Sequence, residues 1–188
     1  LTLEQSYRTT VEIMDAANLG FADNSFEYVY SLNTFEHIGS LKETYREIYR
    51  VLKPGGMVYV AASPIWTSYR GNHFYHWDLD RRDIILPWEH IYPGRDSLLS
   101  RLQSSNPELR EEIDQYVFKS DYLNRVPISK HFDSILDSGL SIRSISTECK
   151  FEISKIPSAD YIRHISAKTG IPVTELLVDY YSVVLEKP

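Results

Sequence analysis

The stretch of residues 23–56 constrains the fold of this chain of 188 residues more than any other part of it. Residues 26–30 are short, aromatic and β-branched, which is typical of a strand buried in a parallel sheet. Apolar residues then recur at helical spacing through residues 41–52, with charged residues between them. Residues 57–62 read as a second strand. The stretch therefore predicts a β-α-β unit with a parallel strand pair.

The ends of the predicted helix carry their own signals. Ser40 is placed to act as the N-cap, and Glu43 three residues later predicts a capping box. Residues 53–56, K-P-G-G, end the helix, because proline cannot continue it and glycine supplies the positive φ of a turn. Residues 31–34 follow the first strand at its carboxyl end, where open α/β sheets place their ligand crevice.

Three motifs in this region resemble class I S-adenosylmethionine-dependent methyltransferases. They are D-N-S-F-E-Y-V-Y-S, then F-E-H-I, then L-K-E-T-Y-R-E-I-Y-R-V-L-K-P-G-G. The resemblance implies an α/β, Rossmann-like, doubly wound fold with a mainly parallel sheet, an antiparallel C-terminal edge and helices on both faces. It also implies S-adenosylmethionine as cofactor and S-adenosylhomocysteine as product. The cofactor residues that it implies in the loop after the first strand are Ser31, Leu32, Asn33 and His37.

The start of the chain departs from the family pattern. That pattern opens with a strand and a glycine-rich loop, G-x-G-x-G, whereas no glycine precedes Gly20 here. Glycine is needed there so that the backbone approaches the cofactor without a Cβ clash. We therefore expect a single methyltransferase domain over residues 1–188 that is N-terminally truncated and lacks the first strands.

Residues 11–14 are expected to form a short strand that ends at Asp15 and Ala16. The resemblance implies that these two residues contact the adenine, through the Asp15 carboxylate and a backbone N–H. The alternative is that Asp15 only caps the turn that follows. Without its family neighbours, the strand at residues 11–14 is expected to be displaced, to pair against residues 26–30, or to pair with another chain.

Composition excludes several classes of function. The net charge of −6, without a basic run, disfavours a nucleic-acid partner. No apolar run approaches the roughly 20 residues that span a bilayer, so no membrane partner is expected. The single cysteine, Cys149, points to no oxidising compartment and favours a cytoplasmic protein, with Cys149 as a small core residue. Fourteen tyrosines fit an aromatic pocket or a core and an interface, which leaves a homodimer open.

The rest of the chain is expected to alternate helices and strands around one insertion. Residues 69–124 form the insertion, which in this family serves as a lid and sets the substrate. Short helices are expected within it at residues 97–102 and 108–113. The elements expected after the insertion are a helix at 129–138 with Ser129 as N-cap, a strand at 141–152, a helix at 159–169, a helical turn at 173–178 and a closing strand at 180–187.

Histidines mark where the chemistry is expected. Histidine suits proton transfer near neutral pH, and the candidate bases are His37, His73 and His76. His37 has an alternative role as support for the cofactor loop. The candidate substrate contacts on the loop after the second strand are Tyr69, Asn72, His73 and Tyr75. His73 and His76 have no evident third ligand, so no metal is expected.

The remaining histidines have structural readings. His90 is expected to pack in the interior, and His131 and His164 to lie on the surface.

The sequence thus predicts methyl transfer from S-adenosylmethionine to a small-molecule acceptor, at oxygen or nitrogen, with a sugar or a secondary metabolite fitting the polar, aromatic insertion by analogy. One alternative is a non-catalytic methyltransferase remnant used for binding or assembly. Another is a nicotinamide-dependent oxidoreductase, which would not explain Asp15-Ala16 together with R-V-L-K-P-G-G.

Overall fold

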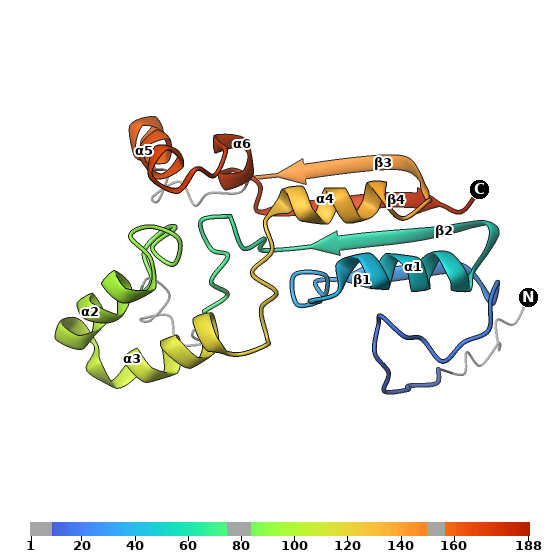
Figure 1. Ribbon diagram of the computed structural model, residues 1–188, viewed down its shortest axis with the longest axis horizontal. Helices are drawn as coiled ribbons and strands as arrows, with labels where there is room; N and C mark the ends of the chain where they lie inside the picture. Colours follow the sequence, from blue (N-terminus) through green and yellow to red (C-terminus); the bar gives the residue numbers. More distant parts are fainter. Residues whose placement is uncertain (1–8, 75–83, 150–156) are drawn as a thin grey trace, which may run out of the picture.

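A computed structural model describes residues 9–74, 84–149 and 157–188 of the chain. A four-stranded mixed sheet in the order β1-β2-β4-β3 organises it (Figure 1). The strands are β1 Phe26–Leu32, β2 Leu52–Ala62, β3 Ser141–Glu148 and β4 Tyr180–Glu186. The helices are α1 Leu41–Val51, α2 Arg95–Ser105, α3 Pro107–Ile113, a π-helical turn Asp114–Lys119, α4 Ile128–Leu136, α5 Ala159–Thr169 and α6 Val173–Leu176.

The predicted β-α-β unit is confirmed. β1 pairs in parallel with β2, with Val29 opposite Val58. Leu41, Tyr45 and Ile48 are buried on the inner face of α1, as their spacing predicts. The capping box is wrong, because Ser40 makes no side-chain bond at the helix start and contributes only its carbonyl, which accepts from the Thr44 N–H at 3.0 Å.

The C-terminal edge of the sheet is antiparallel, as the resemblance implies. β4 pairs antiparallel with β2 on one side and with β3 on the other. The sequence places helix α5 correctly, with Gly170 at φ 75° ending it in the left-handed region where glycine is at no disadvantage.

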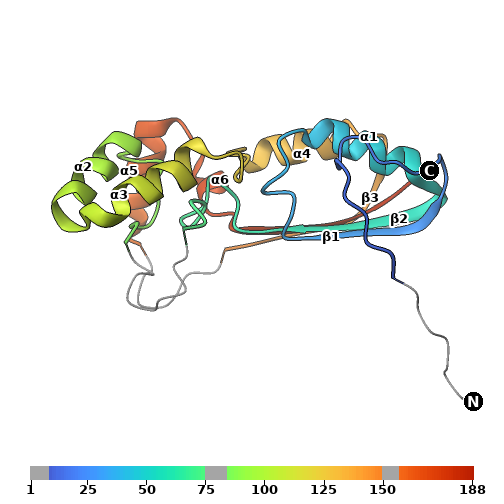
Figure 2. The same ribbon diagram turned by 90° about the horizontal axis from the view of Figure 1, so that it is seen from below.

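Helices α1 and α4 cover one face of the sheet, which Figure 2 shows edge-on. Val58, Val60 and Val183 are fully or almost fully buried beneath them. On the opposite face, where the resemblance also implies helices, Tyr28 and Tyr30 are 73% and 78% exposed. Within the described ranges, then, the sheet is layered with helices on one side.

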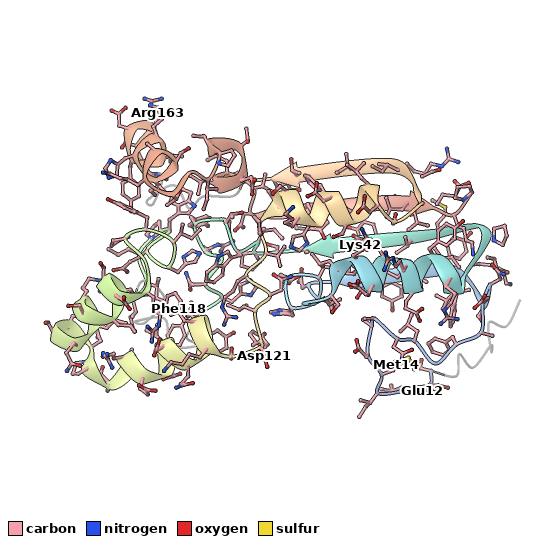
Figure 3. The ribbon with its side chains drawn as sticks, in the orientation of Figure 1. Glu12, Met14, Lys42, Phe118, Asp121 and Arg163 are labelled. Carbon is pink, nitrogen blue, oxygen red and sulfur yellow. The ribbon has the colours of Figure 1, made fainter. Side chains whose placement is uncertain are left out.

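Residues 11–14 form no strand, so that element of the sequence prediction is wrong. Val11 and Ile13 are fully exposed, and Figure 3 shows Glu12 and Met14 on the outside of a segment that lies apart from the sheet. The expectation that this segment is displaced is confirmed. The contacts that hold the turn after it run to Arg50 near the end of α1, which donates to the carbonyls of Leu19 and Phe21 at 2.9 and 2.7 Å.

The insertion builds a core of its own beyond the carboxyl ends of β1 and β2. The two helices expected there are confirmed as α2 and α3, and the π-helical turn follows them. Its centre is formed by side chains that are fully buried, namely Leu98, Leu102, Ile113 and Val117. The insertion thus has its own hydrophobic core and lies next to the carboxyl ends of β1 and β2.

The burial predicted for two side chains, His131 and Cys149, is wrong. α4 begins at Ile128, with Pro127 as the N-cap residue in place of Ser129. His131 lies on the inner face of this helix and is 0% exposed. Cys149, expected in the core, lies exposed immediately after β3. Partial desolvation raises the pKa of the Cys149 thiol to about 11, which leaves it protonated and unreactive at neutral pH.

The buried His131 predicts a stability change with pH. Its burial lowers the pKa of His131 to about 4, below the roughly 6.5 of an exposed histidine. Between these values the unfolded state binds a proton that the folded state does not, so the free energy of unfolding falls as the pH falls from 6.5 toward 4. For this one group the loss between pH 7 and pH 5 is about 2 kcal/mol.

We expect His131→Leu to remove that loss, as measured by urea unfolding at pH 7 and pH 5. The matched control is His164→Leu, which replaces an exposed histidine on α5 and is expected to keep the wild-type pH dependence. Glu36, with its pKa raised to about 7, acts in the opposite direction in all three proteins and cancels in the comparison. An unchanged pH dependence in His131→Leu would contradict the prediction.

Candidate functional site

The site lies where the loops after β1 and β2 meet the returning end of the insertion. Asn33 N–H donates to the Ala61 carbonyl at 2.8 Å, which ties the loop after β1 to the end of β2. The Asn124 amide donates to the carbonyls of Phe35 and Ile38 at 2.7 and 3.0 Å. These bonds hold residues 33–38 between the sheet and the insertion, at the edge where parallel sheets bind ligands.

His37 has a defined tautomer. Its Nδ1 lies 2.7 Å from the Tyr122 carbonyl oxygen. A carbonyl only accepts, so Nδ1 carries the proton and the neutral ring keeps a lone pair on Nε2. The His37 side chain is 24% exposed, so the ring is accessible to a ligand. The arrangement fixes the orientation of the ring and leaves Nε2 able to accept a proton.

His73 packs against His37, with ring centroids 5.1 Å apart. Its Nε2 donates to the Pro64 carbonyl at 2.6 Å. Burial lowers the pKa of His73 to about 4, more than the Pro64 bond raises it. His73 is therefore neutral at pH 7, and it takes up a proton less readily than an exposed histidine does.

Glu36 is a residue that the sequence prediction did not select. Its side chain is 2% exposed, and its Oε1 lies 3.9 Å from His37 Nε2. Burial raises the pKa of Glu36 to about 7, against the lowering effect of its own and the Ser63 backbone N–H groups. In the sequence, Glu36 could have been noticed as the neighbour of a candidate base. That its side chain points into the interior is decided only by the fold.

Tyr116 and Tyr122 were also missed. The Tyr122 ring lies 4.3 Å from the His37 ring, and Tyr116 lies 5.1 Å from Tyr122, centroid to centroid. Tyr116 comes from the π-helical turn, a geometry that is frequent at functional sites. The insertion thus supplies an aromatic ring beside the His37 ring and a second one behind it. Figure 3 labels Phe118 and Asp121 where the chain leaves this turn.

The other predicted substrate residues do not gather at His37. Tyr69 is 4% exposed and packs on Trp88 with centroids 6.0 Å apart. Asn72 is buried and accepts from the Phe74 N–H at 2.9 Å. Both have structural contacts that the sequence does not reveal. Tyr75 and His76 lie outside the described residues.

His90 is confirmed as a packed histidine. It is 4% exposed, with Nε2 donating to the Trp66 carbonyl at 2.9 Å. Burial lowers the pKa of His90 to about 4. His164, as expected, is exposed.

The predicted cofactor residues lie in two places. Asp15 is exposed, and its Oδ1 accepts from the Ala17 N–H at 2.9 Å, so the turn-capping alternative is seen directly. Ala16 is half-buried beside it. Ser31 is half-buried and Leu32 is exposed at the end of β1, next to Asn33 with φ 48°. No described contact joins Asp15 to His37.

In residues 9–74, 84–149 and 157–188, no three His, Cys, Asp or Glu side chains are grouped to hold a metal ion. The helices of those same ranges are all too short or too polar to cross a bilayer.

The β1-α1-β2 region is the part of this chain that resembles a known protein family. Residues 2–60 match the family model described as a methyltransferase domain. Phosphoethanolamine N-methyltransferase 2 of Caenorhabditis elegans is 40% identical over 57 residues, which are 30% of this chain and 13% of that protein. Sterol 24-C-methyltransferase of Schizosaccharomyces pombe is 49% identical over 43 residues, 23% of this chain and 11% of that protein.

The chain matches less than a fifth of the length of either relative. Among solved structures, geranyl diphosphate C-methyltransferase from Streptomyces coelicolor overlays with a TM-score of 0.47 at 10% identity, over 94% of this chain and 53% of that one. The family match falls on the strand, loop and helix that carry His37. Residues 2–60 of this chain are therefore similar to a methyltransferase domain, and the two relatives named above are methyltransferases.

Proposed function

We propose that this protein transfers a methyl group from S-adenosylmethionine to a small-molecule acceptor, with His37 as the general base. The observation that carries the proposal is the fixed tautomer of His37 at the carboxyl ends of two parallel strands, within the region that matches the methyltransferase family. A ring that is 24% exposed and keeps a lone pair on Nε2 suits removal of a proton from an acceptor.

The residues present fit part of the cofactor. Asp15 uses one carboxylate oxygen for Ala17, and its second oxygen would accept from the adenine amino group while the Ala16 N–H would donate to a ring nitrogen. Ser31, Leu32 and Asn33, at the end of β1, would lie along the methionine part, with His37 near the transferable methyl group. When bound, S-adenosylmethionine supplies an electrophilic methyl carbon on a sulfonium.

The chain's own residues would orient the acceptor and take its proton. The Tyr122 carbonyl holds the Nδ1–H of His37, so Nε2 receives the proton. His73, neutral and hydrogen-bonded to Pro64, would support the ring and contact the substrate. Tyr116 and Tyr122 would flank the acceptor, and residues 69–124 would act as the lid, with Tyr69, Asn72, Tyr75 and His76 as further members of the substrate loop. Positioning of this kind makes the reaction effectively unimolecular.

The acceptor proposed here is an oxygen or nitrogen nucleophile on a polar molecule such as a sugar or a secondary metabolite. The relatives named above act on phosphoethanolamine and on sterols, at nitrogen and at carbon, and each match covers well under half of this chain. A base at pH 7 is needed by an oxygen or nitrogen acceptor that must lose a proton. A cytoplasmic location and a homodimer remain predictions of the sequence.

The test is calorimetric titration of S-adenosylhomocysteine into this chain and into the complete product of its gene. Micromolar binding by the complete product supports the proposal, and no binding by either protein favours the non-catalytic remnant. Asp15→Asn keeps an oxygen for Ala17 but removes the charge, and in the complete product it is expected to weaken binding by about tenfold or more if Asp15 contacts the adenine.

The matched control for this titration is Asp23→Asn, which removes a charge from an exposed carboxylate that Arg50 contacts at 2.9 Å. It is expected to leave the affinity unchanged. Equal affinities in the wild type and Asp15→Asn would restrict Asp15 to its turn-capping role.

A further inference from the structure

We propose that Glu36 is a positioning residue whose carboxylate stabilises the imidazolium that His37 becomes during methyl transfer. The inference rests on the proposed function, because it assigns His37 as the base. It assigns a role to Glu36, a buried acid that neither gives nor takes the proton that His37 accepts.

The geometry places one carboxylate oxygen beside the reactive nitrogen. Glu36 Oε1 lies 3.9 Å from His37 Nε2, the nitrogen that carries the lone pair. Glu36 Oε2 is buried and has no hydrogen-bond partner among the described residues. An ionised carboxylate that is buried without a cation is unfavourable, so a positive charge on His37 would supply the partner that Glu36 otherwise lacks.

The groups around Glu36 and His37 come from two other elements, the loop after β2 and β4. The Ser63 backbone N–H, from the loop after β2, donates to the carboxyl. The Tyr181 hydroxyl of β4 lies close enough that the Glu36 charge helps to raise the pKa of Tyr181. On the far side of His37, His73 is neutral at pH 7, and Arg70 lies close enough to help to lower the pKa of His73.

Burial raises the pKa of Glu36 to about 7, so the carboxyl is poised between its two states near neutral pH. In the reaction, an acceptor X–H gives its proton to His37 Nε2 as the C–X bond forms. The bond from the methyl carbon to sulfur breaks, and the electron pair stays on sulfur. Glu36 forms no covalent bond and transfers no proton in this step; in its ionised form it faces the imidazolium until His37 returns its proton to water.

The experiment is a ¹³C NMR titration of the glutamate side-chain carboxyls in the complete gene product. Glu36→Gln keeps the shape of the side chain and identifies the Glu36 resonance by its disappearance, and Glu36→Asp serves the same purpose if the glutamine variant does not fold. We expect the Glu36 midpoint near pH 7 in the wild type. In His37→Asn, which keeps a donor for the Tyr122 carbonyl, we expect it to rise by about one pH unit, because the residue next to the Glu36 carboxylate can no longer take up a proton.

The control is Glu43→Gln on the first turn of α1, which removes the same charge from a side chain that is more than half exposed. It is expected to leave the Glu36 midpoint unchanged. A midpoint below about pH 5, near that of an exposed glutamate, or one that does not move in His37→Asn, overturns the proposal.

Steady-state kinetics separate this inference from the proposed function. Glu36→Gln is expected to lower kcat about tenfold with KM unchanged, and to shift the acidic limb of the kcat profile to lower pH, which a merely structural role would not do. A wild-type protein that transfers no methyl group, yet shows the coupled titration, would refute the proposed function and leave the Glu36–His37 pair standing.

Discussion

Replacement of His37 by asparagine is expected to lower kcat for methyl transfer by about 10²- to 10⁴-fold, the usual contribution of a general base. The His37 Nδ1–H is held by the Tyr122 carbonyl at 2.7 Å, and Nε2 is the nitrogen left to accept a proton. Asparagine places its amide N–H where Nδ1–H lies, so the contact with Tyr122 is kept and only the basic nitrogen is lost. The loss in kcat therefore reports on proton transfer.

The measurement is kcat of the complete gene product at saturating S-adenosylmethionine, across pH 6 to 9. His164→Asn is the matched control, because His164 is an exposed histidine on α5 that contacts the Tyr92 hydroxyl at 3.2 Å. Its kcat is expected to equal that of the wild type. If His37→Asn also keeps the wild-type kcat, His37 supports the cofactor loop and is not the base.

Replacement of Gly71 by alanine is expected to destabilise the fold by about 3 kcal/mol. A Cβ at this position would lie 2.2 Å from the Trp66 carbonyl oxygen and 2.5 Å from that of Ile65. Both are backbone atoms, so neither moves aside as a flexible side chain does. The strain falls on the loop after β2, in which Ser68 donates to the buried Asp179 at 2.8 Å and His73 contacts Pro64.

Urea unfolding monitored by circular dichroism measures this effect. Gly20→Ala is the control, because a Cβ there meets nothing within 4 Å and its φ is not in the left-handed region. It is expected to change the free energy of unfolding by less than about 0.5 kcal/mol. A Gly71→Ala protein as stable as Gly20→Ala would mean that the loop accommodates the methyl group by moving.

Local patterns in the sequence were enough for the elements that depend on neighbours along the chain. The apolar spacing at Leu41, Tyr45 and Ile48 predicted α1 and its buried face. The alternation at the C-terminus predicted β4, and Gly170 marked the end of α5. Each signal lies within a few residues of the element that it specifies, and for that reason it can be read before any tertiary contact is known.

Burial and strand pairing, which depend on contacts between segments distant in sequence, were decided only by the tertiary structure. His131 was expected on the surface, and only the packing of α4 against Tyr181 of β4 buries it. Residues 11–14 have a strand pattern but no neighbouring strand among the described residues, and a strand without a partner leaves its backbone groups unpaired.

The candidate site also depends partly on local sequence and partly on tertiary contacts. The sequence by itself determined that a histidine follows the first strand of a β-α-β unit and that this unit resembles a methyltransferase. The tautomer of His37 depends on the carbonyl of Tyr122, which lies 85 residues further along the chain. The burial of Glu36 depends on segments equally remote in sequence, among them Asn124, whose N–H donates to the Glu36 carbonyl at 3.1 Å. Such contacts form only when the chain folds, because no local spacing brings those groups together.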